Sequence, residues 1–125
     1  MAIKDIRVMI VDDEAFFRKV LRDILEKIGF TVVAEAANGT EAVQQFRTHH
    51  PHVTIMDIYM PEKNGIEATK EMIAIDSNAK VLIASASDYD YDIQAALDSG
   101  AKMNLLKPFV PKEVFEGIKK VLTGK

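Results

Sequence analysis

Carboxylate, hydroxyl and ammonium side chains directly follow short apolar segments at several points of this chain. Asp12 and Asp13 follow the first apolar segment, and Asp57 ends another. Ser85 and Lys107 follow two further segments nearer the C-terminus. Each residue alone is an ordinary helix cap, turn residue or solvated charge. Their shared placement at segment ends instead favours one common polar site.

The three carboxylates would repel one another in such a site. Two unit charges about 4 Å apart repel by roughly 4 kcal/mol at an effective dielectric constant of 20. A fold that gathers Asp12, Asp13 and Asp57 therefore needs a compensating positive charge, and the candidates are Lys107 and a divalent cation. All-oxygen ligation favours Mg²⁺, with Mn²⁺ as the alternative.

The elements that must position these groups alternate along the chain. Apolar runs predict strands, and apolar positions spaced by three and four residues, as in the segment 17–28, predict amphipathic helices. The expected strands are 6–11, 30–36, 53–56, 80–84 and 103–106, and the expected helices are 17–28, 40–48, 66–75, one ending near Gly100 and one opening at Pro111. Thr40 is the expected cap of the second helix, after an Asn38-Gly39 turn. This alternation predicts an α/β fold with a doubly wound parallel sheet, whose strand ends meet at one edge.

Composition narrows the functional classes. The chain has 125 residues, a net charge of −3, 48% hydrophobic residues and no cysteine. The absence of cysteine excludes a disulfide scaffold, a thiolate zinc site and a cysteine nucleophile. The acidic balance argues against a nucleic-acid partner, and no apolar run reaches the roughly 18–20 residues of a membrane span. We expect one cytoplasmic domain over residues 1–125, without a signal peptide.

Four short motifs carry a resemblance to a known family. They are Val-Asp-Asp-Glu at 11–14, Met-Asp-Ile-Tyr-Met-Pro at 56–61 with Asn64-Gly65, Ser85-Ala86, and Lys107-Pro108-Phe109. In this order and spacing the chain resembles the receiver domains of two-component response regulators, of the stand-alone chemotaxis type. The resemblance covers essentially the whole chain. It implies a flavodoxin-like, five-stranded sheet of order 2-1-3-4-5 flanked by five helices, with no output domain.

The resemblance also implies the chemistry of the acidic residues. Asp57 would be the phosphoacceptor, whose carboxylate attacks phosphorus to form an acyl phosphate. Asp13 and Asp57 would ligate Mg²⁺ directly, Asp12 would do so mostly through water, and the backbone carbonyl of Tyr59 would be a further ligand. The domain would then catalyse only its own phosphorylation and slow dephosphorylation, and would not be a classical enzyme.

The remaining motif residues would act on the phosphoryl group. Lys107 would pair with its oxygens, helped by a cis bond to Pro108, and Ser85 would donate a hydrogen bond to it. Many receivers have tyrosine or phenylalanine three residues before the lysine, but this chain has Asn104, which puts the usual aromatic switch in doubt. The Tyr59 side chain is expected to overhang the cleft and limit the access of water.

The resemblance also implies protein partners. A sensor histidine kinase would supply the phosphoryl group, and a downstream protein would bind the monomeric domain through residues 91–122. With Asn104 in place of the aromatic ring, the loop 87–91 is expected to carry part of the response.

Three other functions remain open at this stage. A phosphorelay intermediate would look much the same. A small aspartyl-phosphate phosphohydrolase also needs clustered carboxylates and a lysine, but such enzymes generally carry a cap or extra loops that 125 residues do not accommodate. Flavin binding is disfavoured because the acidic segment at 12–14 would repel a flavin phosphate.

Overall fold

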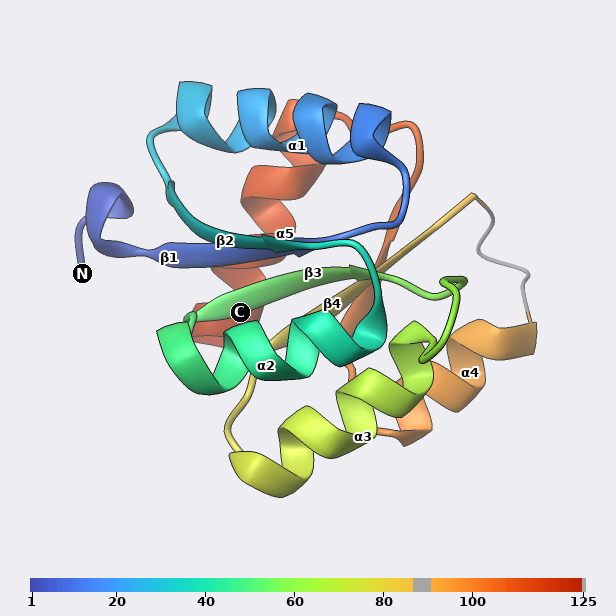
Figure 1. Cartoon of the computed structure of the whole chain (residues 1–125). Coiled ribbons are helices and arrows are strands. Elements are labelled where there is room, and N and C mark those ends of the chain that lie inside the picture. The colour runs from blue at the N-terminus through green and yellow to red at the C-terminus, as the bar shows by residue number, and fades with distance from the viewer. Residues whose placement is uncertain (87–90, 125) are drawn as a thin grey trace.

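The computed structural model describes residues 1–86 and 91–124, which form a parallel sheet covered by helices on both faces (Figure 1). The sheet has five strands in the order β2-β1-β3-β4-β5, and every neighbouring pair is parallel. The strands are β1 (Arg7–Val11), β2 (Thr31–Ala36), β3 (Val53–Asp57), β4 (Val81–Ser85) and β5 (Met103–Leu106). This confirms the predicted fold class and strand order.

Strands in the middle of the sheet are buried on both sides. Every residue of β3 and β4 is buried, as is all of β1 except Arg7. In the sequence these strands are nearly continuous apolar runs, which is the pattern of a parallel sheet covered on both faces. Their ends are therefore fixed by a rigid core, and so are the polar side chains that follow them.

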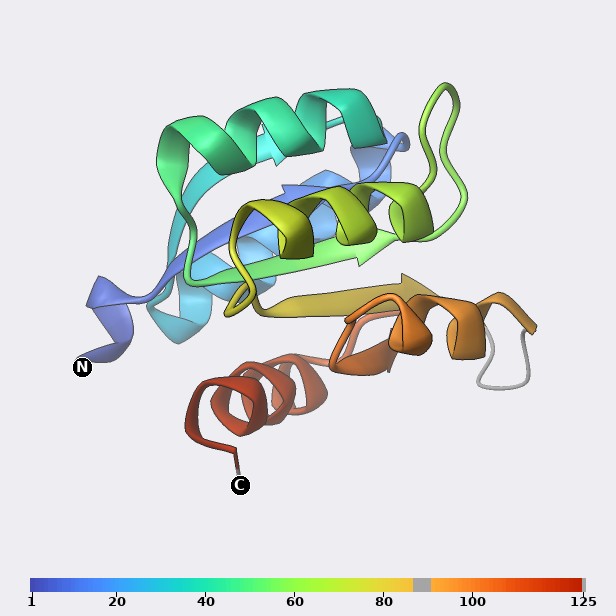
Figure 2. The same ribbon diagram turned by 90° about the horizontal axis from the view of Figure 1, so that it is seen from below.

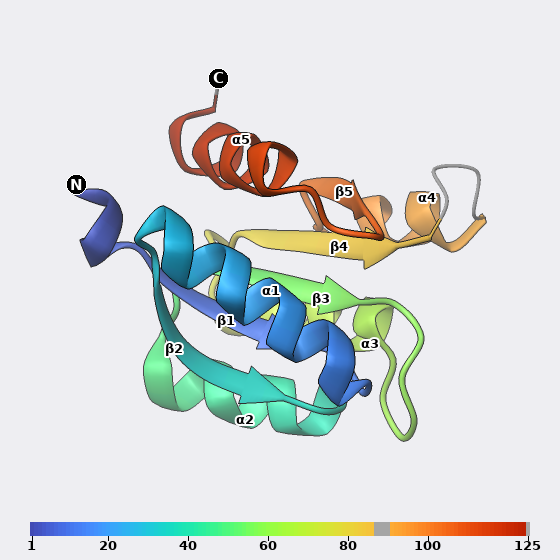
Figure 3. The same cartoon turned by 90° about the horizontal axis from the view of Figure 1, so that it is seen from above.

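Two layers of helices complete that core. Helices α1 (Ala15–Ile28) and α5 (Pro111–Thr123) cover one face (Figure 3), and α2 (Gly39–His49), α3 (Gly65–Ile75) and α4 (Tyr91–Asp98) cover the other (Figure 2). Each face has its own cluster of buried apolar side chains, separated by the sheet.

The start of α2 corrects the sequence interpretation, and α3 begins in the same way. The cap of α2 is Asn38, whose side chain accepts a hydrogen bond of 2.8 Å from the backbone N–H of Glu41, so the assignment of the cap to Thr40 was wrong. Asn64 caps α3 in the same way. The glycine after each asparagine lies against backbone: a Cβ at Gly65 would collide with the carbonyl oxygen of Asp57, and one at Gly39 with that of Lys63. Both Asn-Gly pairs therefore begin helices.

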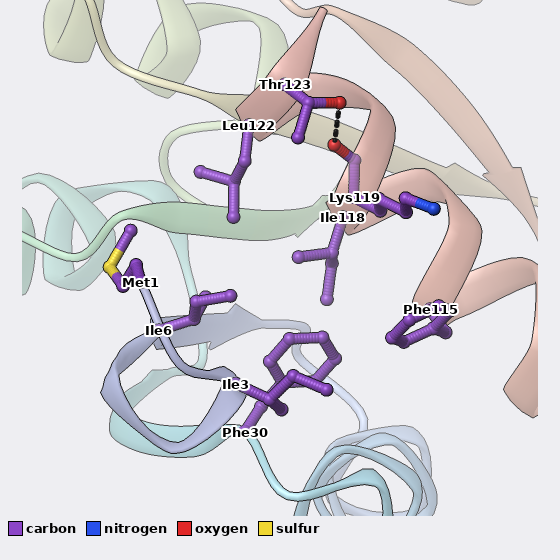
Figure 4. A pocket seen from close by; sticks show the side chains of 9 residues that line it. All are labelled: Met1, Ile3, Ile6, Phe30, Phe115, Ile118, Lys119, Leu122 and Thr123. Carbon is purple, nitrogen blue, oxygen red and sulfur yellow. Dashed lines mark hydrogen bonds between the residues drawn. The ribbon is translucent and has the colours of Figure 1, made fainter. Parts of the chain in front are cut away.

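A short 3₁₀ helix at Ile3–Asp5 was not predicted, and it packs at the amino edge of the sheet. Together with the end of α5 it borders an apolar pocket of about 410 Å³ (Figure 4). Its lining residues are Met1, Ile3, Ile6, Phe30, Phe115, Ile118, Lys119, Leu122 and Thr123. In the part of the chain that the structure describes, no helix is both long enough and apolar enough to cross a membrane.

Candidate functional site

The polar residues at the strand ends meet in one cleft of about 520 Å³ at the carboxyl edge of the sheet. Asp12 directly follows β1, and Asp57 and Ser85 are the last residues of β3 and β4. Lys107 directly follows β5. The residues lining the cleft are Asp13, Glu14, Phe17, Asp57, Tyr59, Ser85, Ala86, Lys107 and Pro108. The residues singled out in the sequence are thus brought together.

The acidic residues form a group able to hold a cation. Asp12, Asp13 and Asp57 each offer a carboxylate oxygen, and these atoms all lie within 4.8 Å of one another. Asp12 is 3% exposed and Asp57 is 8% exposed, whereas Asp13 is open to solvent. The backbone N–H of Glu14 donates a hydrogen bond of 2.9 Å to Oδ1 of Asp12 and so orients its carboxylate.

Lys107 supplies the positive charge in the cleft. Its Nζ lies 2.7 Å from Oδ2 of Asp12 and 3.6 Å from Oδ1 of Asp57. The same ammonium lies 4.1 Å from the centroid of the Phe17 ring, within the range of a cation–π contact. The backbone N–H of Lys107 donates to the carbonyl of Ser85 at 2.8 Å, and the bond to Pro108 is cis, as the resemblance implied.

One ammonium does not balance three carboxylates. The pKa of Asp57 is raised to about 6, chiefly by burial, and the charges of Asp12 and Asp13 add to that increase. Lys107 acts in the opposite direction, because its positive charge favours the ionised carboxylate. The cleft therefore carries an excess of negative charge that a further cation would relieve.

A small, hard divalent cation fits this donor set. The side-chain donors are all carboxylate oxygens, which Mg²⁺ prefers, and one or two carboxylates with bound water are its usual protein ligands. The solvent-exposed position of Asp13 leaves room for such waters. No thiolate or imidazole belongs to this group, so its chemistry does not favour zinc or copper.

On the side of the cleft formed by Ser85, a hydroxyl is already hydrogen-bonded to a neighbouring side chain. The Ser85 Oγ donates a hydrogen bond of 3.0 Å to Oδ1 of Asn104, on the neighbouring strand β5. The asparagine that replaces the usual aromatic ring is thus directly bonded to the hydroxyl at the site. In the loop 87–91, for which a signalling role was expected, residues 87–90 lie outside the described residues, and the described Tyr91 is 96% exposed.

One residue at this site was missed by the sequence interpretation. The Tyr59 hydroxyl donates a hydrogen bond of 2.6 Å to Oδ2 of Asp92, in the first turn of α4. Asp92 had no motif signal, because the contact depends on how α4 packs beside the loop that follows β3.

Comparisons with known proteins agree with this geometry. The family model described as the response regulator receiver domain matches residues 8–119. The chain is 47% identical to the chemotaxis protein CheY of Thermotoga maritima, covering 92% of this chain and 96% of that protein. It is 46% identical to CheY of Bacillus subtilis, covering 93% and 97% respectively. One chain of the crystal structure of the CheX–CheY–BeF3–Mg²⁺ complex of Borrelia burgdorferi superposes with a TM-score of 0.87 at 32% identity, covering 93% of this chain and 88% of that one.

Proposed function

The chain belongs to the response regulator receiver family, and from this premise we propose that Mg²⁺-dependent phosphorylation of Asp57 switches its binding to a downstream protein in chemotaxis-type signalling. The observation that carries the proposal is the convergence of Lys107 and three carboxylates on one cleft at the carboxyl edge of the sheet. Receivers related to CheY are signalling proteins rather than classical enzymes.

Asp57 would act as the nucleophile. One of its carboxylate oxygens forms a bond to phosphorus, and the bond between phosphorus and the donor's leaving group breaks. With a kinase phosphohistidine as donor, the leaving group is the imidazole nitrogen. The transition state is loose, so alignment and neutralisation of charge matter more than covalent assistance.

The other cleft residues would serve that neutralisation. Lys107 would pair with a phosphoryl oxygen, a role supported by the position of its Nζ between Oδ2 of Asp12, at 2.7 Å, and Oδ1 of the acceptor Asp57, at 3.6 Å. Asp12, Asp13, Asp57 and the Tyr59 backbone carbonyl would hold Mg²⁺, which supplies positive charge to the phosphoryl oxygens.

Ser85 would pass the change on to the surface. Its hydroxyl can donate to only one acceptor at a time, so a hydrogen bond to the phosphoryl group would replace the one to Asn104. Asn104 also lines a groove between β5 and α5, with Glu113 and Glu116 on its far side. The face at 91–122, expected to bind the partner, includes this groove, so a rearranged Asn104 amide would alter the surface there.

The proposal also includes protein partners. Residues 1–125 would act as one receiver unit, phosphorylated by a sensor histidine kinase. The related Borrelia complex contains CheX, Mg²⁺ and BeF3 together with CheY, which supports both the cation and a phosphoryl-dependent protein partner for this chain.

Intact mass spectrometry would test the proposal. The protein is incubated with acetyl phosphate, with and without Mg²⁺, and compared with Asp57→Asn and with the matched control Asp98→Asn on α4. We expect one phosphoryl group on the wild type and on the control, only with Mg²⁺, and none on Asp57→Asn. An adduct on Asp57→Asn would refute the site, and many turnovers of acetyl phosphate per protein would indicate a phosphohydrolase instead.

A further inference from the structure

The side chain of Tyr59 connects the loop after β3 with helix α4. Its hydroxyl donates to Oδ2 of Asp92 at 2.6 Å, across 33 positions of sequence. Tyr59 also lines the cleft that contains Asp57. The hydrogen bond therefore fixes one wall of the cleft to α4, although none of the described residues of α4 lines the cleft.

The bond is well suited to hold the ring. A hydroxyl that donates to a carboxylate makes a stronger hydrogen bond than one that donates to a neutral acceptor. Asp92 lies in the first turn of α4, where the helix dipole favours a negative charge. Tyr59 is 54% exposed, so packing restrains its ring less than it would restrain a buried ring.

We propose that Asp92 is a positioning residue, which holds the Tyr59 ring at the mouth of the cleft and thereby prolongs the life of phosphorylated Asp57. The proposal rests on the proposed phosphorylation of Asp57. In the hydrolysis, the oxygen of water bonds to phosphorus and the bond from phosphorus to the Asp57 oxygen breaks. A proton of the water passes to solvent, leaving inorganic phosphate and a free carboxylate.

The rate of this hydrolysis depends on how easily water reaches the phosphoryl group. The attacking water must approach phosphorus roughly in line with the Asp57 oxygen that leaves, and thus from the cleft. A ring anchored at its hydroxyl leaves the wall closed, whereas a ring released from Asp92 samples other rotamers and opens it. The same opening admits a small phosphodonor, so phosphorylation by acetyl phosphate is expected to accelerate together with hydrolysis.

The test measures first-order loss of the phosphoryl group by intact mass, after removal of acetyl phosphate, in Mg²⁺ buffer. Tyr59→Phe removes only the hydroxyl and is expected to lose the group about five-fold faster, the effect of one lost hydrogen bond. Asp92→Ala is expected to match it, and the double variant is expected to decay no faster than either single variant. Asp92→Asn keeps an acceptor oxygen and is expected to lie closer to wild type.

Matched controls separate positioning from general damage. Tyr91→Phe deletes a hydroxyl from the neighbouring exposed tyrosine, and Asp98→Ala deletes a carboxylate from the same helix; both are expected to decay like wild type. A variant that is merely destabilised would be phosphorylated more slowly, whereas release of the ring accelerates both reactions.

Two results would overturn the inference while leaving the proposed function intact. In the first, Tyr59→Phe accepts the phosphoryl group and loses it at the wild-type rate. In the second, Asp92→Ala accelerates the loss equally in the Tyr59 and Phe backgrounds, so that Asp92 does not act through the tyrosine. Failure of the wild type to form any adduct would instead refute the proposed function.

Discussion

At the carboxyl edge of the sheet the cleft of about 520 Å³ gathers carboxylates, a hydroxyl and a lysine, whereas at the amino edge the pocket of about 410 Å³ is lined mainly by aliphatic and aromatic side chains. The cleft lies at the carboxyl ends of β1, β3, β4 and β5, whereas the pocket lies beside the residues that precede β1 and β2 and is closed by α5. In the cleft, burial raises the pKa of Asp57 to about 6, and the nearby charges of Asp12 and Asp13 add to that increase. In the pocket, Ile6, Phe30 and Ile118 are buried, and burial of their apolar surface favours the folded state.

This difference separates function from stability along one sheet. The carboxylates at the carboxyl edge repel one another, and a bound cation would relieve this repulsion. That edge is therefore suited to binding. Groups at the amino edge already stabilise one another, so their substitution lowers the free energy of unfolding without touching the chemistry. Substitutions at the two edges should therefore produce opposite signatures.

The largest effect is expected at the amino edge. Ile118 is 0% exposed and belongs to the core between α1, α5 and the sheet. Ile118→Ala leaves a cavity there and is expected to lower the free energy of unfolding by about 3 kcal/mol. Urea denaturation followed by circular dichroism measures this loss. The folded variant should still accept a phosphoryl group from acetyl phosphate, and failure to do so below the transition would break the comparison.

The next effect is the response to Mg²⁺. Because the cation binds the folded cleft and not the unfolded chain, it is expected to raise the free energy of unfolding by about 2.7 kcal/mol at a hundred times its dissociation constant. Asp13→Asn should reduce this gain, since it removes a carboxylate from the group. The gain is measured from denaturation curves with Mg²⁺ and with a chelator. Ile118→Ala should show the full gain, because its defect lies at the other edge.

A smaller effect of the opposite sign is expected for Asp57→Asn in metal-free buffer. The folded-state pKa of about 6 lies above the ordinary value of 3.8, so the folded state binds the proton more tightly than the unfolded state does. Wild-type stability therefore falls as pH rises from about 4 to 6, and asparagine avoids that loss. At pH 7 the variant is expected to be more stable by about 1–2 kcal/mol after allowance for solvent screening. Thermal melts at pH 4 and pH 7 measure the difference, which should be much smaller at pH 4, close to the ordinary pKa of 3.8. A gain of equal size at both would refute its electrostatic origin.

The smallest effects concern the helix caps. Asn38→Ala and Asn64→Ala each remove a side-chain acceptor from a helix start and are expected to cost about 1 kcal/mol. Denaturation curves measure both losses. Replacement by aspartate keeps the acceptor and should restore most of the stability. Thr40→Ala is the matched control and is expected to change little, because Asn38 provides the cap.

Much of the site was predictable because its residues continue buried strands. The apolar runs located the ends of β1, β3 and β5, and hence placed Asp12, Asp57 and Lys107 at one edge. The identity of the partners of Ser85 was not predictable in this way. Its bond to Asn104 depends on the register of two neighbouring strands and on side-chain rotamers.

Other features had no unambiguous signal in the sequence. The Asn38-Gly39 pair was interpreted as a turn because that dipeptide is typical of turns, and the collision that requires glycine at position 39 comes from distant backbone. The 3₁₀ helix at Ile3–Asp5 is too short to show a period. The bond between Tyr59 and Asp92 joins segments 33 residues apart, and no pattern marks either residue for it.

The two glycines that begin α2 and α3 have a consequence for mutational tolerance. A side chain at Gly39 or Gly65 collides with backbone of the segment that runs from Asp57 to Lys63. In a library of point variants, selection for any property of the folded protein should therefore remove the variants at both positions. Asp57 should behave differently: a sort for thermal resistance favours its replacement, and a sort for phosphorylation retains it. Positions that are depleted only in the selection for phosphorylation would therefore identify residues of the cleft, because the two glycines are depleted in both selections.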